Sequence, residues 1–252
     1  MRDGVDAGPV VVAGSGGPAP ALVFSGRVMA GRARLLGPVD LRAEAGRWTC
    51  LLGPSGVGKS TLLHCLAGLD AGLDVVGRVT ASAGQVALMG QSDGLLPWLD
   101  LRDNVMLGAR LRGDRPDAAR ADALLARVGL ADMAGRRPRA LSGGQRQRAA
   151  LARTLYEDRP VVLLDEPFSA LDVATRARMQ DLAAAALRGR TVLHVTHDPS
   201  EAARLGERIL ILTAGGLQDA TPPDAPPMPR PPDAPATLQV TGRLTRLLLE
   251  AA

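Results

Sequence analysis

The stretch GPSGVGKST at residues 53–61 constrains the fold of this chain more than any other feature. Before it, RWTCLLG at 47–53 is a short apolar run that ends in glycine, and after it KSTLLHCLAGL has the spacing of a helix. Strand, glycine-rich turn and helix are the context that the phosphate-binding pattern G-x-x-x-x-G-K-[ST] requires. We therefore expect a phosphate-binding loop that opens a helix.

The residue types of this loop fit its expected chemistry. The glycines let successive N–H groups point at phosphate oxygens, and the following helix adds the positive end of its dipole. Lys59 is the only lysine of the chain; its compact ammonium would meet the β- and γ-phosphates, where a guanidinium is too broad. Ser60 is expected to ligate Mg²⁺. The residues of this loop that we expect to contact the nucleotide are Gly53, Pro54, Ser55, Gly56, Val57, Gly58, Lys59, Ser60 and Thr61.

A second motif, VVLLDEP at 161–167, predicts a strand buried on both faces. Asp165 would emerge at the carboxyl end of that strand, where open α/β sheets bind their ligands. There it would hold Mg²⁺ through water, and Glu166 would orient and deprotonate the attacking water. Two solvated acids at a strand end are the alternative.

The third motif is LSGGQRQR at 141–148, in which Ser142, Gly143, Gly144 and Gln145 open a predicted helix. Their exposed N–H groups would form a second anion site. A capped turn is the alternative interpretation when Ser-Gly-Gly is considered alone.

The order of elements predicts an α/β fold with a P-loop NTPase core and a mostly parallel sheet. Aliphatic strands at 161–165 and 191–196 alternate with helices. We expect a disordered tail at 1–20 and, within the domain at 21–213, a helical subdomain inserted at about 92–159. From 214 to 252 we expect a proline-rich linker, extended and unable to pack, and a short helix with Leu244, Leu247 and Leu248 on one face.

Composition limits the classes of function. The net charge is +4 and the pI about 10.0, but the arginines are dispersed, so we expect no nucleic-acid partner. Cys50 and Cys65 are too few for a disulfide framework and indicate a reducing compartment. The sequence contains no apolar run of about 18 residues, so any membrane role must come from a partner.

Five ordered motifs together resemble the nucleotide-binding subunits of ABC transporters: GPSGVGKST, Gln91, LSGGQRQR, VVLLDEPFSALD and VTHD. The resemblance covers about residues 22–213 and implies an ABC ATPase domain at 21–213 with an N-terminal antiparallel β-subdomain. It implies that Gln91 touches Mg²⁺ and the attacking water, that Asp172 communicates across a dimer, and that His197 contacts the γ-phosphate. Without the resemblance, Gln91 would be an ordinary loop amide, and His197 would be a polar residue at a strand end. His194 is interpreted as a packed histidine and His64 receives no role.

The resemblance also implies the partners and cofactors of the chain. It implies ATP and Mg²⁺, and a second copy arranged head to tail, so that Ser142 and Gly144 of one chain cap the ATP at Lys59 of the other. It further implies a membrane permease, a separate solute-binding protein and a place on the cytoplasmic face of the inner (plasma) membrane.

Two details refine the expectation. SDGLLPW at 92–98 resembles importers for nitrate, sulfonates, taurine and thiamine pyrimidine precursors, and RWTCLLGPSGVGKSTLL resembles the last group most. Leu96 and Trp98 are interpreted either as anchors for the permease or as core.

The adenine-stacking aromatic of the family is replaced near Met29 or Ala30, so we expect looser base discrimination. Trp48 is predicted to be core.

Three other classes of function remain open at this stage. They are a soluble ABC-type ATPase that acts on nucleic acid or ribosomes, the ATPase of an ABC exporter, and a P-loop kinase. The first lacks the paired cassettes or coiled-coil insertion typical of such proteins, EPFSALD resembles importers more than exporters, and the kinase leaves LSGGQRQR and His197 unexplained.

Overall fold

The computed structural model describes residues 19–69, 72–80, 84–222 and 226–250. The predicted disordered tail at 1–20 therefore lies almost wholly outside the described residues. Of its last two residues, Pro20 accepts a 2.7 Å hydrogen bond from the Thr191 hydroxyl through its carbonyl oxygen.

Six strands form the central sheet in the order β5-β6-β7-β3-β8-β9. They are β3 (Trp48–Leu52), β5 (Val86–Met89), β6 (Val161–Asp165), β7 (Thr191–Val195), β8 (Arg208–Thr213) and β9 (Gly216–Asp219). All neighbouring pairs are parallel except β8 and β9. The expected α/β fold with a mostly parallel sheet is confirmed.

The strands of this sheet are buried on both faces because each one supplies alternate residues to two cores. Leu51, Leu163 and Leu193 point to the core that contains α1 (Lys59–Leu66). Leu52 and Leu164 point to the other core, which the remaining helices cover. The continuous apolar runs of the sequence reflect this double burial.

A second sheet of three antiparallel strands packs over α1 in the order β2-β1-β4. Its strands are β1 (Leu22–Ala30), β2 (Ala33–Ala43) and β4 (Asp74–Thr80). Phe24 and Leu41 of this sheet lie in the α1 core with no more than 1% of their surface exposed. This is the predicted N-terminal antiparallel β-subdomain.

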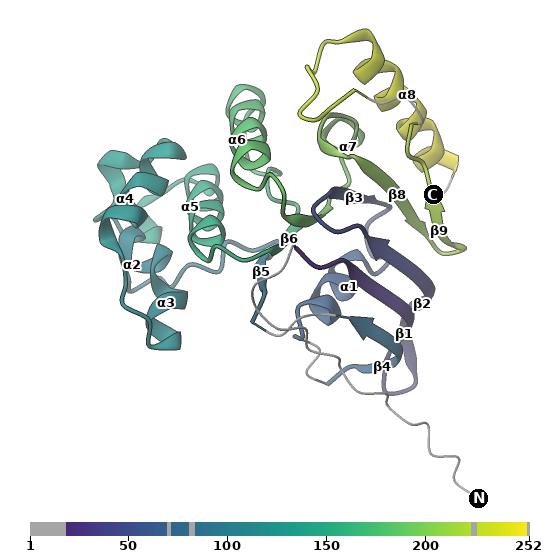
Figure 1. The fold of residues 1–252 in the computed structure, drawn as a ribbon, viewed down its shortest axis with the longest axis horizontal. Helices are drawn as coiled ribbons and strands as arrows, with labels where there is room; N and C mark the ends of the chain where they lie inside the picture. Colours follow the sequence, from purple (N-terminus) through teal and green to yellow (C-terminus); the bar gives the residue numbers. More distant parts are fainter. Residues whose placement is uncertain (1–18, 70–71, 81–83, 223–225, 251–252) are drawn as a thin grey trace, which may run out of the picture.

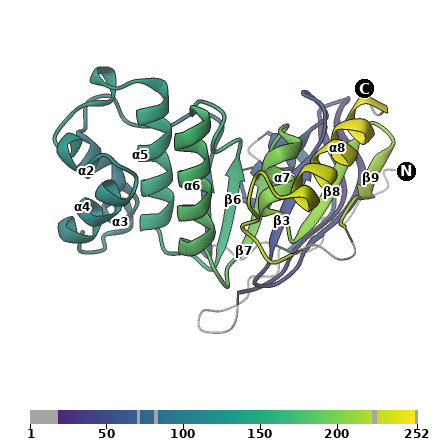
Figure 2. The same ribbon diagram turned by 90° about the horizontal axis from the view of Figure 1, so that it is seen from above.

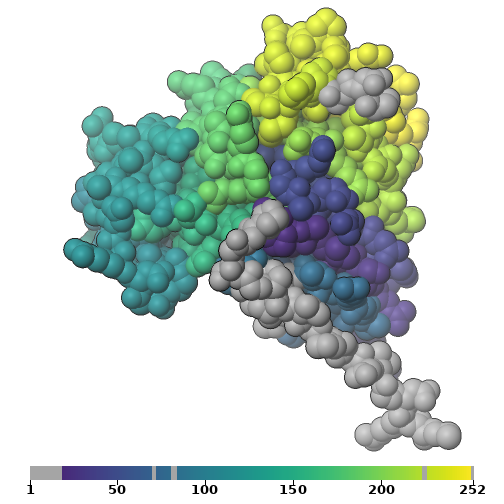
Figure 3. All heavy atoms as spheres, in the orientation of Figure 1, coloured from purple at the N-terminus to yellow at the C-terminus, as the bar shows by residue number. Residues whose placement is uncertain are grey.

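Helices between β5 and β6 form a separate lobe beside the sheet (Figure 1; Figure 3). They are α2 (Leu101–Val105), α3 (Leu107–Arg112), α4 (Ala118–Arg127) and α5 (Gly143–Tyr156), with short 3₁₀ turns at Ala131–Met133 and Pro138–Ala140. The lobe occupies the part of the chain where the sequence predicts an inserted helical subdomain. Seen from above, α6 (Val173–Ala186) lies between this lobe and the central sheet (Figure 2).

The C-terminal part differs from the expected linker in two ways. First, β9 continues the sheet beyond residue 214. Second, the described part of the proline-rich segment packs, because the Arg230 guanidinium is buried and donates to the carbonyls of Ala203 and Gly206 at 2.7 and 2.9 Å. Those carbonyls lie at the end of α7 (Pro199–Leu205), where a helix leaves acceptors without partners and attracts a cation.

The last helix, α8 (Pro235–Glu250), lies against α7 (Figure 1). Leu244 is fully buried there, and Leu247 and Leu248 pack against the same core, as the sequence predicts. In the described part of the chain, no helix combines the length and apolar character needed to cross a bilayer.

Candidate nucleotide site

The predicted phosphate loop follows β3 and leads directly into α1. Its backbone has positive φ angles of 155°, 80° and 104° at Gly53, Gly56 and Gly58, which favour glycine. A Cβ at Gly58 would lie 2.9 Å from Leu36 Cδ1 and 3.1 Å from the carbonyl oxygen of Leu35. The loop therefore needs glycine at this position both for its conformation and for the approach of β2.

Lys59 closes the loop from within. Its ammonium donates to the carbonyl oxygens of Gly53 at 2.8 Å and Pro54 at 2.9 Å, and only 7% of the residue is exposed. Burial lowers the pKa of Lys59, and the negative charges of Glu166 and Asp165 oppose that shift. The only lysine ammonium of the chain is thus fixed at the N-terminus of α1, beside Glu166 and Asp165.

Asp165 ends β6 with 2% of its surface exposed and hydrogen-bonds the Ser60 side chain. Burial is the main cause that raises its pKa, and the charge of Glu166 adds to it. The Ser60 hydrogen bond and the charges of His64 and Lys59 lower it. A buried carboxylate with a hydroxyl beside it is an all-oxygen ligand set, which Mg²⁺ prefers. The residues fit the metal that the sequence implies.

Glu166 has an unusual backbone for a residue with a side chain, with φ at 49°. Its amide donates to the Val195 carbonyl at 2.9 Å, and its Oε1 lies 2.9 Å from Nδ1 of His197. The end of β7 therefore supports both the main chain and the carboxylate of Glu166. His197 is mostly exposed, so it can contact a ligand while it holds Glu166.

A cavity of about 250 Å³, the phosphate cavity, brings eight of the predicted residues together, six of them from the phosphate loop. Gln91 and Glu166 line it together with residues of the phosphate loop. Its lining consists of Leu35, Ser55, Gly56, Gly58, Lys59, Ser60, Thr61, Gln91 and Glu166. A loop that cradles phosphate, an ammonium, a buried acid and a second acid held by a histidine can bind and hydrolyse a phosphoanhydride.

The predicted second anion site lies elsewhere in the chain. Ser142 caps α5: its hydroxyl accepts from the Gln145 amide at 3.2 Å, while the Gln145 side chain accepts from the Ser142 amide at 2.8 Å. Ser142 and Gly143 are exposed, and none of residues 142–145 is among the described residues that line the phosphate cavity. Gly144 is close to the Ala170 carbonyl oxygen, which a Cβ would approach to 3.0 Å.

Asp172 caps α6 and is exposed. Its side chain accepts from the Thr175 amide at 3.0 Å, and the backbone hydrogen bond to Thr175 is the main cause that lowers the pKa of this carboxyl. The predicted role of Asp172 across a dimer stays a prediction, because a single chain is described.

The other expectations for individual side chains have clear outcomes. His194 is fully buried with its ring edge-on to Trp48 and Phe168, so the interpretation of a packed histidine is confirmed. Trp48 is core, as predicted, and both cysteines are buried. Trp98 is 66% exposed, so the interpretation of Trp98 as a core residue is wrong.

Two residues beside the cavity were missed by sequence reasoning. Leu35 lines it although 40% of this large apolar residue is exposed. Gln147 contacts the loop after Asp165 from α5. A leucine in a strand and a glutamine in a helix carry no signal of their own; only the packing of distant segments reveals them.

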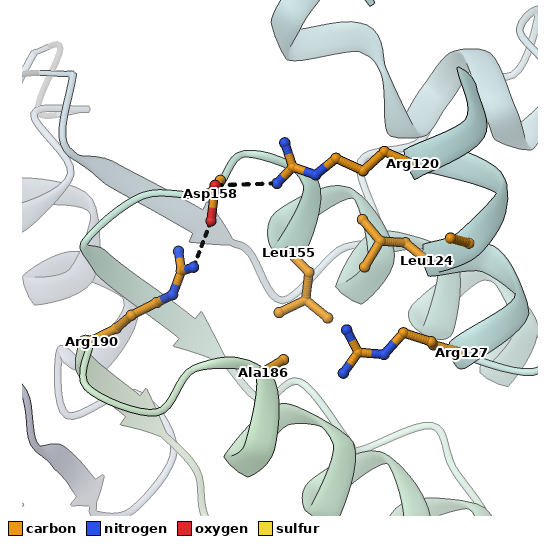
Figure 4. A pocket seen from close by; sticks show the side chains of 8 residues that line it. Arg120, Leu124, Arg127, Leu155, Asp158, Ala186 and Arg190 are labelled. Carbon is orange, nitrogen blue, oxygen red and sulfur yellow. Dashed lines mark hydrogen bonds and ion pairs between the residues drawn. The ribbon is translucent and has the colours of Figure 1, made fainter. Parts of the chain in front are cut away.

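Another cavity lies near the opposite end of the strands (Figure 4). Its charged lining includes Asp158 and Arg190, which precede β6 and β7, and Arg120 of α4. Asp158 pairs with Arg190 at 2.5 Å and with Arg120 at 3.5 Å. No predicted site residue lines it, and ligands of open α/β sheets bind at the carboxyl ends of strands. We therefore place the site at the phosphate loop.

Comparisons with known proteins agree with this geometry. The family model described as ABC transporter matches residues 36–169. The aliphatic sulfonates import ATP-binding protein SsuB of Delftia acidovorans is 46% identical over 217 residues, which cover 85% of this chain and 88% of that protein. An SsuB protein of Rhodococcus jostii is 48% identical over 202 residues, 78% of this chain and 80% of that protein.

Solved structures with the same fold include a dimer of the bacterial ABC transporter cassette MJ0796. Its TM-score is 0.71 at 29% identity, and the match covers 79% of this chain and 97% of the other. A post-hydrolysis dimer of the same cassette, bound to ADP and Pi, has a TM-score of 0.69 at 29% identity, with 79% and 98% covered.

Proposed function

The chain belongs to the ABC transporter family as an importer-type ATP-binding subunit with ATPase activity, and from that premise we propose how its own residues perform the reaction and which system it serves. One observation carries the proposal: Lys59, Glu166 and Gln91 line one cavity with the phosphate loop. The ammonium and loop amides would hold the phosphates, and Glu166, oriented by His197, would take the proton of the attacking water.

We propose that Mg²⁺ is held by Ser60 and Asp165, with Gln91 as a further ligand. The hydrogen bond between Ser60 and Asp165 and the burial of that carboxylate support this assignment. When bound, the metal would neutralise phosphate charge. Asp165 would then stay ionised despite its burial, because a cation beside a carboxylate favours the charged form.

The proposed second partner is another copy of this chain. Ser142 and Gly143 are exposed at the start of α5, outside the phosphate cavity of their own chain. A head-to-tail arrangement would bring these amides over the nucleotide of the other copy and complete its contacts. Both MJ0796 cassette structures are dimers, and one holds ADP and Pi, which supports this arrangement.

A permease is the third proposed partner, and Trp98 is its proposed anchor. The residue is exposed on the loop between Gln91 and α2, where buried Asn104 fixes the backbone. The Asn104 side chain accepts from the Leu96 amide at 2.7 Å and donates to the Asp100 carbonyl at 2.9 Å. An exposed tryptophan on a loop whose backbone is held in this way is the kind of residue that dominates protein interfaces.

Trp98→Ala should weaken assembly with the permease by about 10-fold or more, since the variant loses the aromatic anchor that the permease would cover. Affinity of the isolated chain for ATP should stay unchanged. Co-purification and a titration with fluorescent nucleotide measure the two effects. Leu249→Ala is the matched control, because Leu249 is 75% exposed on α8 and far along the chain. A fully assembled, transporting Trp98→Ala complex would refute the anchor.

The base of the nucleotide would meet an aliphatic surface. Met29 is the residue before the last one of β1 and pairs with Arg34 of β2; neither Met29 nor Ala30 is among the described residues that line the phosphate cavity, whereas Leu35 is. Without a ring to stack on, adenine and guanine should bind with affinities within about 10-fold of each other, since aromatic stacking contributes about 0.5–1.5 kcal/mol.

Leu35→Tyr should raise affinity for ATP by about 2- to 10-fold, the equivalent of one stacking contact. Competition against a fluorescent nucleotide measures the affinity for ATP and for GTP. Leu69→Tyr, at an exposed leucine just beyond the other end of α1, is the control and should have no effect. Strong exclusion of GTP by the unmodified chain would overturn this account of the base.

We propose that the imported solute is an aliphatic sulfonate and that the chain works at the cytoplasmic face of the membrane beside its permease and a solute-binding protein. The names of several relatives at 42–48% identity support sulfonates over thiamine pyrimidine precursors or nitrate. Uptake assays with the reconstituted permease and each of the three solute classes test the choice. Uptake of the pyrimidine or of nitrate without sulfonate would reject it.

A further inference from the structure

Gln147 of α5 reaches the loop that follows β6 and makes three hydrogen bonds there. Its Nε2 donates to the Glu166 carbonyl at 3.0 Å and to the Ser169 hydroxyl at 3.2 Å. Its Oε1 accepts from the Ala170 amide at 2.9 Å. Only 8% of Gln147 is exposed, and these partly buried bonds fix the loop to the helix.

The carbonyl that Gln147 holds belongs to Glu166, a residue with a strained backbone. Glu166 has φ at 49°, a left-handed conformation that persists only where the surroundings enforce it. Three groups donate to its carbonyl oxygen: the Gln147 amide, the Ser169 hydroxyl at 3.1 Å and the Ser169 backbone N–H at 3.4 Å. The Val195 carbonyl holds its amide from the opposite side. The direction of the Glu166 side chain therefore depends on contacts to its main chain.

We propose that Gln147 is a positioning residue for Glu166. By fixing the Glu166 peptide, it keeps the carboxylate directed into the cavity that Lys59 and Gln91 line. The inference rests on the proposed role of Glu166 as the base that takes a proton from water. A base displaced by a fraction of an ångström loses rate without loss of substrate binding, because binding depends on the phosphate loop.

The same contacts tie the base to the helix that begins at Ser142. Gln147 lies on α5, and Gly144 of that helix meets the Ala170 carbonyl oxygen at the other side of the loop. Residues 166–170 are therefore held by the first two turns of α5. A shift of α5 would move the Glu166 carbonyl with it, so the proposed proton transfer would respond to the position of the lobe.

A purely structural role is the competing explanation, and the chain offers a matched control for it. Gln180 of α6 is also buried, with 4% exposed, and accepts from Arg204 at 2.6 Å. Gln180 is not among the described residues that line the phosphate cavity. Replacement of either glutamine by leucine removes buried hydrogen bonds from the middle of a helix, so both should lower thermal stability.

Steady-state ATP hydrolysis by the full chain separates the two roles. Gln147→Leu should lower kcat by about 10- to 100-fold and leave KM within about twofold, the pattern of a displaced base. Gln180→Leu should leave both constants unchanged. Gln147→Glu keeps the size and loses both donors, so it should repeat the kcat loss if the leucine variant fails to fold. An unchanged kcat in Gln147→Glu would overturn the proposal. A change of kcat and KM by the same factor in Gln147→Leu or in Gln147→Glu would also overturn it.

Dimer formation distinguishes failure of this inference from failure of the proposed function. Glu166→Gln should form a dimer with ATP, and Gln147→Leu combined with Glu166→Gln should form the same dimer, measured by light scattering. If Glu166→Gln stays monomeric with its permease present, the proposed function fails. If it dimerises while Gln147→Leu keeps full kcat, this inference alone fails. Loss of the dimer only in the double variant would assign Gln147 to dimerisation and reject positioning.

Discussion

Lys59→Ala should lower the affinity for ATP at least 100-fold. The variant loses an ammonium held at 2.8 and 2.9 Å by the Gly53 and Pro54 carbonyls, in a cavity where a charge interacts strongly with phosphate. A 100-fold loss corresponds to about 2.7 kcal/mol, within the range for charge-assisted hydrogen bonds. Isothermal calorimetry or fluorescent ATP measures the loss, and near-normal binding would refute the loop assignment.

Lys59→Arg tests whether charge alone is sufficient. The guanidinium keeps the positive charge, but its planar fork is wider than an ammonium and does not fit between the two carbonyls. We expect it to bind ATP at least about 10-fold more weakly than the unmodified chain. Equal binding by Lys59→Arg would mean that this position needs only a cation, and the single lysine would lose its explanation.

Glu166→Gln should reduce ATP hydrolysis by about 100- to 10,000-fold, the usual contribution of a general base. The amide keeps the size of the side chain but cannot accept a proton from water. Affinity for ATP should remain, because the phosphate loop and Lys59 are unchanged, and an ATP-dependent dimer should accumulate. Phosphate release and light scattering measure the two results.

Glu157→Gln is a closely matched control. The Glu157 side chain is 17% exposed, the same as Glu166, but it pairs with Arg112 on the lobe and is not among the described residues that line the phosphate cavity. Its hydrolysis rate should equal that of the unmodified chain. If Glu166→Gln hydrolysed ATP as fast as Glu157→Gln, Glu166 would not be the base.

The sequence was sufficient where local pattern and motif coincide. VVLLD predicted β6 with the bounds that the structure has, and the glycine spacing predicted the loop around Lys59. Such features can be predicted because each depends on residues within about ten positions of one another. The apolar run is bounded by prolines, and the glycines stand where φ must be positive.

Features that depend on distant segments were not predictable from one sequence. Arg230 looks like a solvated residue in a proline-rich segment, yet it is buried because the open carbonyls of α7 lie beside it. Leu35 faces the cavity because β2 crosses the phosphate loop at Gly58. Gln147 meets Glu166 across 19 positions. In each case the partner is a main-chain group or a surface, which carries no residue-type signal.

The location of the only lysine has a consequence for chemical labelling. All other cationic side chains apart from histidine are arginines, so amine-reactive reagents find a single side-chain target in this chain. That target is 7% exposed and already donates to two carbonyls of its own loop. Acylation of Lys59 would neutralise the ammonium at the phosphate cavity, and a bound nucleotide would shield it. The extent of side-chain amine modification thus reports directly on occupancy of the site.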